Sequence, residues 1–170
     1  MDFTWLAIGD LDRIVEIDHT ERVEATYVQT GGAIALRPIE PFVGGWWPDV
    51  ETTIAFCRDH MRAGAEALGA FDGGALIGIA MLTPGIEPGV AQLSFLQVSA
   101  AWRRHGIATR LLRILLDRAR ALGHARVYVT ATPTPSAVGF YLRAGFVPVK
   151  DPIPRLYALE PDDIHMLAPL

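Results

Sequence analysis

Two neighbouring arginines and a glycine stand at the centre of the segment with the clearest chemical potential, Arg103-Arg104-His105-Gly106-Ile107-Ala108-Thr109. An apolar run at 93–98 precedes this segment, and residues with helical spacing follow it. The first N–H groups of a helix lack partners within the helix, and with the helix dipole they attract anions. Gly106 and Ala108 leave that backbone open, and the arginines add positive charge. We therefore predict a phosphate-binding helix start, although a plain strand-to-helix connection is the alternative that these residues leave open.

A long amphipathic helix is expected to carry this segment. Apolar residues recur every three or four positions, at Ile107, Leu111, Leu115, Ala119 and Leu122, and Gly123 is a natural stop. Seven arginines lie between Arg103 and Arg126. Such a local charge can attract a polyanion, or it can form a solvated helix face. We expect the helix start to bind a ligand and the rest of the arginines to face solvent.

Strands and helices are expected to alternate along the rest of the chain. In the N-terminal half the sequence predicts a strand at 3–8, followed by a short helix that Asp10 caps and that points Leu11, Ile14 and Val15 inward. It then predicts a hairpin at 22–39, which turns at Gly31-Gly32, and a helix at 49–65. In the C-terminal half it predicts a central hairpin at 68–71 and 75–82, a loop at 83–89 and a strand at 126–130 that is parallel to 93–98. A helix capped by Thr134 and ended by Gly145 follows. The last predicted strands, at 146–149 and 164–167, stand on either side of a Pro-rich connector at 151–154.

Two segments carry a resemblance to a known family. Arg103-x-x-Gly106-x-Ala108 resembles the acyl-CoA signature of the GNAT acetyltransferase superfamily, which has Gln or Arg, two residues, Gly, one residue, then Gly or Ala. The segment 136–146, with Ala137, Phe140-Tyr141 and Gly145-Phe146, resembles the second signature of that family. The family often has Asn seven residues before the tyrosine, where this chain has Thr134. The resemblance is good from about residue 68 onward and weak before it.

The resemblance implies a fold and a reaction. The expected fold is mixed α/β (α+β), a single GNAT-like domain over residues 1–170 with a central, splayed, mostly antiparallel sheet flanked by helices. The implied reaction is transfer of an acetyl group from acetyl-CoA to a primary amine by direct attack, and the alternative is a non-catalytic acyl-CoA-binding or regulatory domain. By resemblance, the residues expected to contact acetyl-CoA are Leu96, Gln97, Val98, Arg103, Arg104, His105, Gly106, Ile107, Ala108, Thr109, Thr134 and Phe140.

Catalytic roles also follow from the resemblance. The amide of Val98 is expected to polarise the thioester carbonyl, and such donors can contribute about 3 kcal/mol each. Tyr141 is expected to protonate the leaving thiolate, worth roughly 10² to 10⁴-fold, and its alternative role is to anchor a helix. A general base is not assigned, because no spacing selects among the chemically suitable residues Glu21, Glu66, Glu87, His105 and His165.

The acceptor side is less defined by the sequence. The hairpin at 22–39 stands where the family usually has two helices, so the acceptor residues to inspect are Glu21, Tyr27, Trp46 and Trp47. The adjacent tryptophans could line an acceptor pocket or a dimer interface, and plain packing is the favoured alternative. The expected partners are a small-molecule amine or a peptide or protein amine, and a homodimer is possible.

Composition excludes several other classes. A chain of 170 residues with 51% hydrophobic and 20% charged residues suits one globular domain. A net charge of −4 without a known module disfavours nucleic-acid binding, and no apolar run reaches the roughly 20 residues that span a bilayer. With no basic, apolar leader we expect a cytoplasmic protein. Dispersed histidines predict no metal site, Ser136 lacks a Gly-x-Ser-x-Gly elbow, and Cys57 on an apolar stripe is expected in the core.

Overall fold

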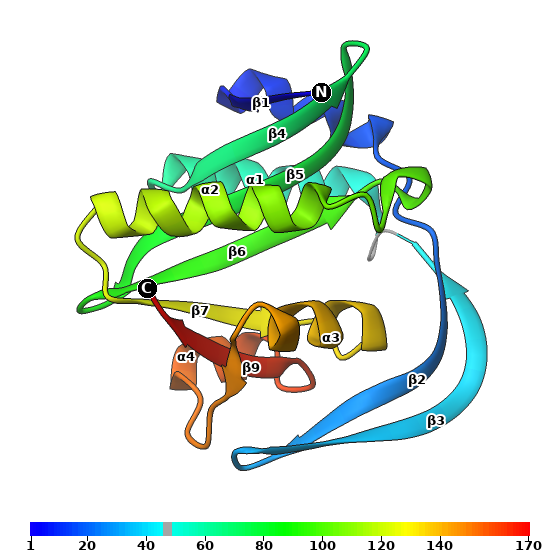
Figure 1. Ribbon diagram of the computed structural model, residues 1–170, viewed down its shortest axis with the longest axis vertical. Coiled ribbons are helices and arrows are strands. Elements are labelled where there is room, and N and C mark those ends of the chain that lie inside the picture. Colours follow the sequence, from blue (N-terminus) through cyan, green and yellow to red (C-terminus); the bar gives the residue numbers. More distant parts are fainter. Residues whose placement is uncertain (46–48) are drawn as a thin grey trace.

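The computed structural model describes residues 1–45 and 49–170, which form a seven-stranded sheet in the order β1-β4-β5-β6-β7-β9-β8 and a separate two-stranded sheet, β2–β3 (Figure 1). The strands are β1 (Asp2–Trp5), β2 (Glu21–Thr30), β3 (Ala33–Gly44), β4 (Glu66–Asp72), β5 (Ala75–Glu87), β6 (Val90–Val98), β7 (Arg126–Ala131), β8 (Val147–Pro148) and β9 (Ile164–Pro169). The helices are η1 (Ile8–Glu16), α1 (Val50–Arg62), η2 (Ala100–Trp102), α2 (Ile107–Ala121), α3 (Pro135–Arg143) and α4 (Pro154–Leu159). Among the described residues, no helix is long and apolar enough to cross a membrane.

Helices cover both faces of the large sheet. Figure 1 shows α2 and α3 on the near face and α1 on the far face. Alternate residues of β5 explain this arrangement: Ala80 and Leu82 join the core cluster of α2, whereas Ile79 and Met81 join the cluster of α1 and η1. A strand that is apolar on both sides must be central, as the sequence predicted for the hairpin formed by β4 and β5.

The sheet splays between β6 and β7. The two strands are parallel, as expected, but they pair only at Val90, Ala91 and Gln92 of β6. Every other described pairing in the large sheet is antiparallel. Beyond Gln92 the strands diverge and leave a gap that faces the hairpin β2–β3 (Figure 1). The expected mixed α/β fold with a splayed, mostly antiparallel sheet is confirmed.

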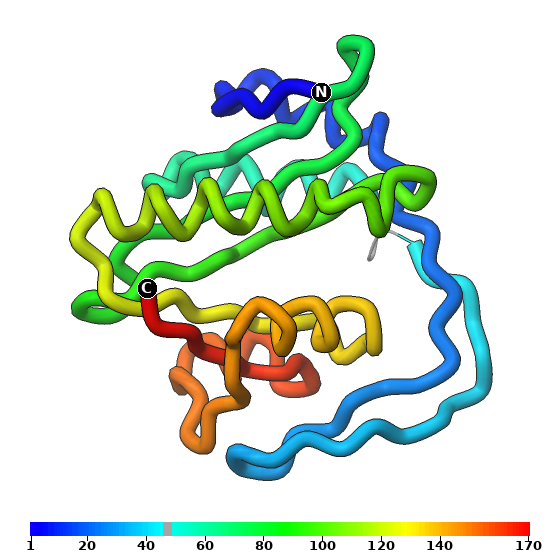
Figure 2. The backbone as a smooth tube through the Cα atoms, in the orientation of Figure 1, coloured from blue at the N-terminus to red at the C-terminus, as the bar shows by residue number. Residues whose placement is uncertain are grey.

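The hairpin β2–β3 forms a long arm around the C-terminal half of the chain, as Figure 2 shows. It turns at Gly31, whose φ of 57° favours glycine. The N–H of Tyr27 donates to the carbonyl of Pro133 at 2.7 Å, which joins the arm to the loop after β7. The predicted hairpin is therefore confirmed, and it lies against the open end of the splayed sheet.

Several local predictions were wrong. Asp10 does not cap η1; it lies inside that helix and accepts from the N–H of Ala7, the N-cap, at 2.8 Å. Val15 is exposed, not inward, because η1 is a 3-10 helix with a different side-chain period. The expected loop at 83–89 is mostly strand, since β5 continues until Glu87 pairs with Val90. The expected connector at 151–154 leads directly into helix α4.

Candidate active site

The end of β6 offers backbone groups to the gap. Ser99 donates its N–H to the carbonyl of Ile77 at 2.9 Å, on the β5 side of the strand. Neighbouring residues in a strand point their backbone groups to opposite sides, so Val98 and, two residues earlier, Leu96 present theirs to the gap. Pairing with β7 ends before these residues. A ligand lying along the gap can therefore accept from the Val98 N–H, whereas the Gln97 backbone is turned to β5.

The start of α2 is open to an anion. Gly106 caps the helix with a φ of 78°, and a side chain built there would meet nothing within 4 Å. The first helical hydrogen bond runs from Arg110 N to Gly106 O at 3.0 Å. The preceding N–H groups of Ile107, Ala108 and Thr109 therefore need partners from outside the helix. Ile107 is only 2% exposed and fixes the helix start in the core. This geometry agrees with the predicted phosphate-binding start.

The two arginines of this segment behave differently. Arg103 is partly buried, and its guanidinium donates to the carbonyls of Val98 at 3.2 Å and Thr20 at 2.9 Å. Arg104 is exposed and takes a left-handed φ of 67°, which is unusual for an arginine. His105 is exposed, and its Nδ1 lies 2.8 Å from the Arg103 carbonyl. Arg103 is thus held to the backbone at the end of β6 and before β2, and Arg104 is the arginine that extends into solvent.

Helix α3 holds the predicted acid beside the gap. Thr134 caps the helix by accepting from Ala137 N at 3.3 Å, as expected. Tyr141 is 6% exposed, and its ring packs edge-on against Phe140 and Phe146, with centroids 5.1 and 5.4 Å away. Burial raises the pKa of Tyr141, so its hydroxyl stays protonated at neutral pH. Tyr141, Val98 and Ile107 all belong to the large core cluster that also includes residues of β4, β5 and β7.

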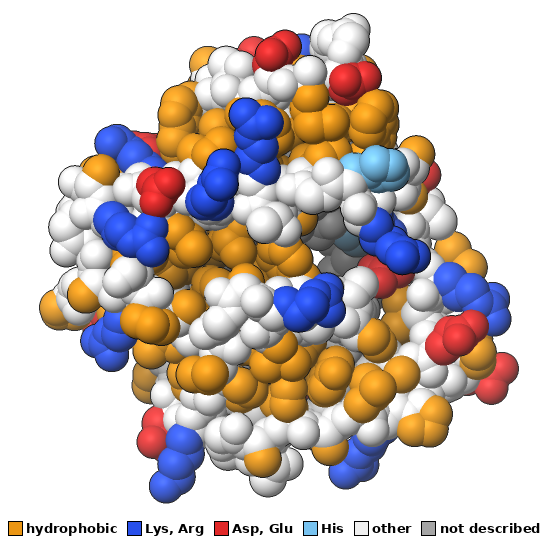
Figure 3. All heavy atoms as spheres, in the orientation of Figure 1, with side chains coloured by type: hydrophobic (Ala, Val, Ile, Leu, Met, Phe, Trp, Pro, Cys, Tyr) orange, Lys and Arg blue, Asp and Glu red, His pale blue; other side chains and the backbone are white. Residues whose placement is uncertain are grey.

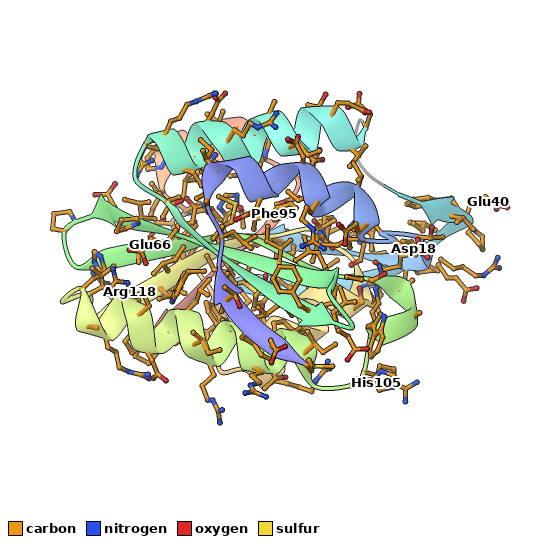
Figure 4. The ribbon with its side chains drawn as sticks, turned by 90° about the horizontal axis from the view of Figure 1, so that it is seen from above. Asp18, Glu40, Glu66, Phe95, His105 and Arg118 are labelled. Atoms are coloured by element: carbon orange, nitrogen blue, oxygen red, sulfur yellow. The ribbon has the colours of Figure 1, made fainter. Side chains whose placement is uncertain are left out.

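Two candidate bases lie away from the gap. Glu66 accepts a bidentate pair of hydrogen bonds from Arg118, at 2.6 and 2.5 Å. In Figure 4 this pair and His105 occupy opposite ends of α2. Glu87 pairs with Val90 at the beginning of β6, whereas Val98 ends that strand. Neither carboxylate can serve a reaction at Val98.

His165 is also unsuited to act as a base. Its Nε2 lies 3.0 Å from the Glu160 carbonyl and must donate, because a carbonyl only accepts. Its Nδ1 lies 2.8 Å from the Tyr128 hydroxyl, which accepts from Ile153 N and can donate to the ring. The imidazole, 1% exposed, therefore has both nitrogens engaged within a buried network.

Comparison with known proteins agrees with this geometry. The family model described as "Acetyltransferase (GNAT) family" matches residues 35–146, more than half of the chain. The chain belongs to the GNAT acetyltransferase family. No curated protein is similar enough in sequence to count as a match.

Solved structures share the GNAT fold over nearly the whole chain. Nourseothricin acetyltransferase is 20% identical with a TM-score of 0.75, covering 99% of this chain and 97% of its own. A Bacillus anthracis protein assigned as a streptothricin acetyltransferase, in complex with acetyl coenzyme A, is 17% identical with a TM-score of 0.72, covering 99% and 98%. The PaiA N-acetyltransferase of Thermoplasma acidophilum, in complex with coenzyme A, is 16% identical with a TM-score of 0.65, covering 100% of both chains. At these identities the likeness establishes the fold.

The hairpin brings two predicted acceptor residues to the open end of this GNAT sheet. Glu21 accepts from the Ser136 hydroxyl at 2.5 Å, which ties the start of β2 to the start of α3. Tyr27 is half-buried and packs against the main core cluster. Trp46 and Trp47 lie outside the described residues. In Figure 3 the surface is hollowed between the start of α2 and α3, with basic side chains on the rim.

A cavity of about 620 Å³ separates the hairpin from the C-terminal segment. Its lining includes residues of β2, Pro133 from the loop after β7, and Tyr157, Asp162 and Asp163 from the C-terminal segment. Burial, with the negative charges of Glu160 and Asp162, raises the pKa of Asp163 to about 7. The acidic run 160–163 is visible in the sequence, but nothing in the linear order connects it with β2.

Proposed function

We propose that this GNAT protein transfers an acetyl group from acetyl-CoA to a primary amine by direct attack. Three features support the proposal: the Val98 N–H that is turned to the gap, the open start of α2, and the buried ring of Tyr141, which belongs to the same core cluster as Val98 and Ile107. Each answers one need of acyl transfer from a thioester, namely carbonyl polarisation, donor binding and proton supply.

Donor binding would use the helix start and the edge of β6. The N–H groups of Ile107, Ala108 and Thr109 suit the pyrophosphate, and Arg104 adds an exposed positive charge. The backbone of Leu96 and Val98 suits the amide groups of the pantetheine arm. Phe140, half-buried beside Tyr141, contributes an apolar wall. The residues present therefore fit acetyl-CoA.

In the proposed reaction the neutral amine nitrogen attacks the thioester carbon, and a C–N bond forms. Negative charge that develops on the carbonyl oxygen is stabilised by the Val98 N–H. The C–S bond then breaks, the thiolate takes the proton of Tyr141, and the amine proton passes to a base or to water. Glu21 is the carboxylate among the original candidates that contacts the open end of the sheet, through Ser136.

Calorimetric titration with acetyl-CoA tests the donor site. We expect saturable binding that is lost in Gly106→Glu, because the new carboxylate would occupy the open space before α2 and repel phosphate. Glu is strained at a φ of 78°, so the variant's folding is checked by circular dichroism and compared with Gly106→Ala, which carries the same strain without charge. Binding that is equal in all three proteins would remove the helix start from the donor site.

Thiol release separates an enzyme from the alternative, a non-catalytic acyl-CoA-binding domain. With an amine acceptor, Tyr141→Phe is expected to lower kcat by about 10² to 10⁴-fold while acetyl-CoA affinity stays unchanged. Tyr128→Phe is the matched control, because it removes a buried tyrosine hydroxyl on the α4 side. That control should lose stability and keep acetyl-CoA affinity, and its kcat should fall far less than that of Tyr141→Phe. Acetyl-CoA binding without turnover on any amine would favour the non-catalytic alternative.

A further inference from the structure

The cavity beside the hairpin lies on the opposite side of the sheet from the donor features. On β7, Val127 and Val129 point into the cluster of α2 and α3, whereas Tyr128 points to α4. The cavity is lined by His165 and Tyr157, which contact each other and lie on the α4 side with Tyr128. A donor held at α2 and an acceptor held in the cavity would therefore approach the gap from opposite faces.

The cavity also lies at the end of the sheet where β6 and β7 diverge. Because β6 and β7 are parallel, the end of β7 at Ala131 and the end of β6 at Val98 lie at the same edge. The first residue of β9, Ile164, pairs with Ala131. Asp163 precedes that residue, and Pro133 follows the end of β7, so both cavity residues lie at the open end of the gap.

The charges that line the cavity favour a positively charged ligand. Two carboxylates, Asp162 and Asp163, line the cavity with the rings of Tyr27 and Tyr157, and Lys150 is the one lysine or arginine in its described lining. The neighbours that act on the Asp163 charge, Glu160 and Asp162, are both acidic. The raised pKa of Asp163 means that its negative charge lacks compensation there. A cation in the cavity would supply that compensation.

Asp163 is too far from Val98 to hold the attacking nitrogen itself. Strand β7 stands between the gap and β9, and neighbouring strands lie about 4.8 Å apart. A ligand that reaches both Val98 and Asp163 must span two such spacings or more, roughly 10 Å. A second positive group on the acceptor, separated from the attacked nitrogen by an extended chain, satisfies this geometry.

We propose that this cavity is the acceptor site and that it selects an amine carrying a second cationic group, which Asp163 binds while the first nitrogen reaches Val98 through the gap. The inference rests on the proposed acetyltransferase function and names its substrate class.

The test compares 1,8-diaminooctane with 8-amino-1-octanol, which have the same length and differ in one charge. Thiol release is expected to give the diamine at least about a tenfold higher kcat/KM, the ratio that corresponds to one charge-assisted contact. Asp163→Asn should bring the two substrates within about twofold of each other, chiefly by lowering kcat/KM for the diamine. Asp117→Asn removes an equal charge from the exposed face of α2 and should keep the preference.

The pH dependence is a second readout. The preference for the diamine should grow between pH 6 and pH 8 as Asp163 ionises, and Asp163→Asn should abolish that growth. The other titratable groups that line the cavity are Asp162, Lys150, Tyr157 and His165, and Glu160 acts on Asp163 from outside the lining. All of them are kept in the variant. Equal kcat/KM for both amines in the natural protein, or a preference that survives Asp163→Asn, would overturn the inference.

Failure of the proposed function is distinguishable from failure of the acceptor site. If neither amine releases thiol, turnover on these acceptors fails, and the same two compounds are titrated calorimetrically into the protein saturated with CoA. Diamine binding that exceeds amino alcohol binding and depends on Asp163 would still support the site. Equal or absent binding of the two compounds would overturn it.

Discussion

Arg103 and Val98 are joined by a hydrogen bond of 3.2 Å from the guanidinium Nε to the backbone carbonyl. A second bond from the same side chain reaches the Thr20 carbonyl at 2.9 Å, just before β2. The first residue of the family's acyl-CoA signature therefore fixes the end of β6 and the start of the hairpin arm. We therefore expect Arg103 to affect donor binding mainly by positioning the backbone of Val98.

Arg103→Ala is expected to destabilise the fold. Each carbonyl would lose a charge-assisted hydrogen bond, and bonds of this kind contribute about 1.5–3 kcal/mol, so we expect the free energy of unfolding to fall by roughly 2–3 kcal/mol in this partly exposed site. Urea denaturation measures the change, with Arg113→Ala on α2 as an arginine control. A variant with unchanged stability and greatly weakened acetyl-CoA binding would instead make Arg103 a direct phosphate ligand.

Arg104→Gly is expected to have the opposite effect on stability. The left-handed conformation of Arg104 costs roughly 1 kcal/mol, which glycine avoids, so the free energy of unfolding should rise by about 0.5–1 kcal/mol. Loss of the exposed charge should raise the Kd for acetyl-CoA about three- to tenfold at low salt. Arg104→Ala separates the two effects, because it removes the charge and keeps the strain. If both variants bind acetyl-CoA as tightly as the natural protein does, the proposed phosphate contact of Arg104 is contradicted.

Local patterns were sufficient to predict α2, α3 with its Thr134 cap, the central hairpin and the open helix start. These features depend on side-chain period and on residues close in sequence. The role of Arg103 could not be predicted, because Thr20 lies 83 residues away. The extended β5 was missed for a related reason: Thr83 to Glu87 has turn-like composition, and its strand conformation comes from pairing with Val90 across a short turn.

The acceptor side shows the same limit more clearly. Its cavity is assembled from β2, the loop after β7 and the segment before β9, which are far apart in the chain. Glu21 and Tyr27, the residues suggested by the sequence, both lie on the β2–β3 arm, but Asp162 and Asp163 come from the other end of the sequence. Such a site becomes visible only when the sheet order is known.

Gln29 is predicted to hold the hairpin arm against the C-terminal strands. Its Nε2 donates to the Val149 carbonyl at 2.7 Å, and its Oε1 accepts from His165 N at 2.8 Å. Gln29→Ala should lower the free energy of unfolding by about 1–3 kcal/mol, because buried backbone groups lose their partners. It should also raise the acceptor KM and leave acetyl-CoA affinity unchanged. Thr30→Ala, at an exposed position of the same strand, is the control. An unchanged acceptor KM in Gln29→Ala would show that the position of the arm does not affect acceptor binding.

Cys57 is predicted to be inert in the folded protein. It is fully buried, and burial raises the pKa of its thiol to about 12, so almost no thiolate forms at neutral pH. A disulfide reagent should not react measurably with native protein at pH 8 and should react with one thiol per chain in denaturant. Cys57→Ser should keep kcat with reduced stability. Rapid labelling of the native protein accompanied by loss of turnover would give Cys57 a role that the core position does not provide.

Asp163 is predicted to make stability fall as pH rises. Its pKa of about 7 in the folded protein exceeds the unfolded value of 3.8, so the folded state binds more protons between these two pH values. Its contribution to stability is therefore greatest below about pH 4 and is lost as pH approaches 7 and above. Asp163→Asn removes this term, and it should be more stable than the natural protein at pH 8 by about 2–4 kcal/mol and nearly equal to it at pH 4. Urea denaturation at both pH values, with Asp117→Asn as the control for a lost surface charge, measures the difference. If the difference in unfolding free energy does not grow with pH, Asp163 carries its negative charge without an energetic penalty. The cavity would then have no need for a cation.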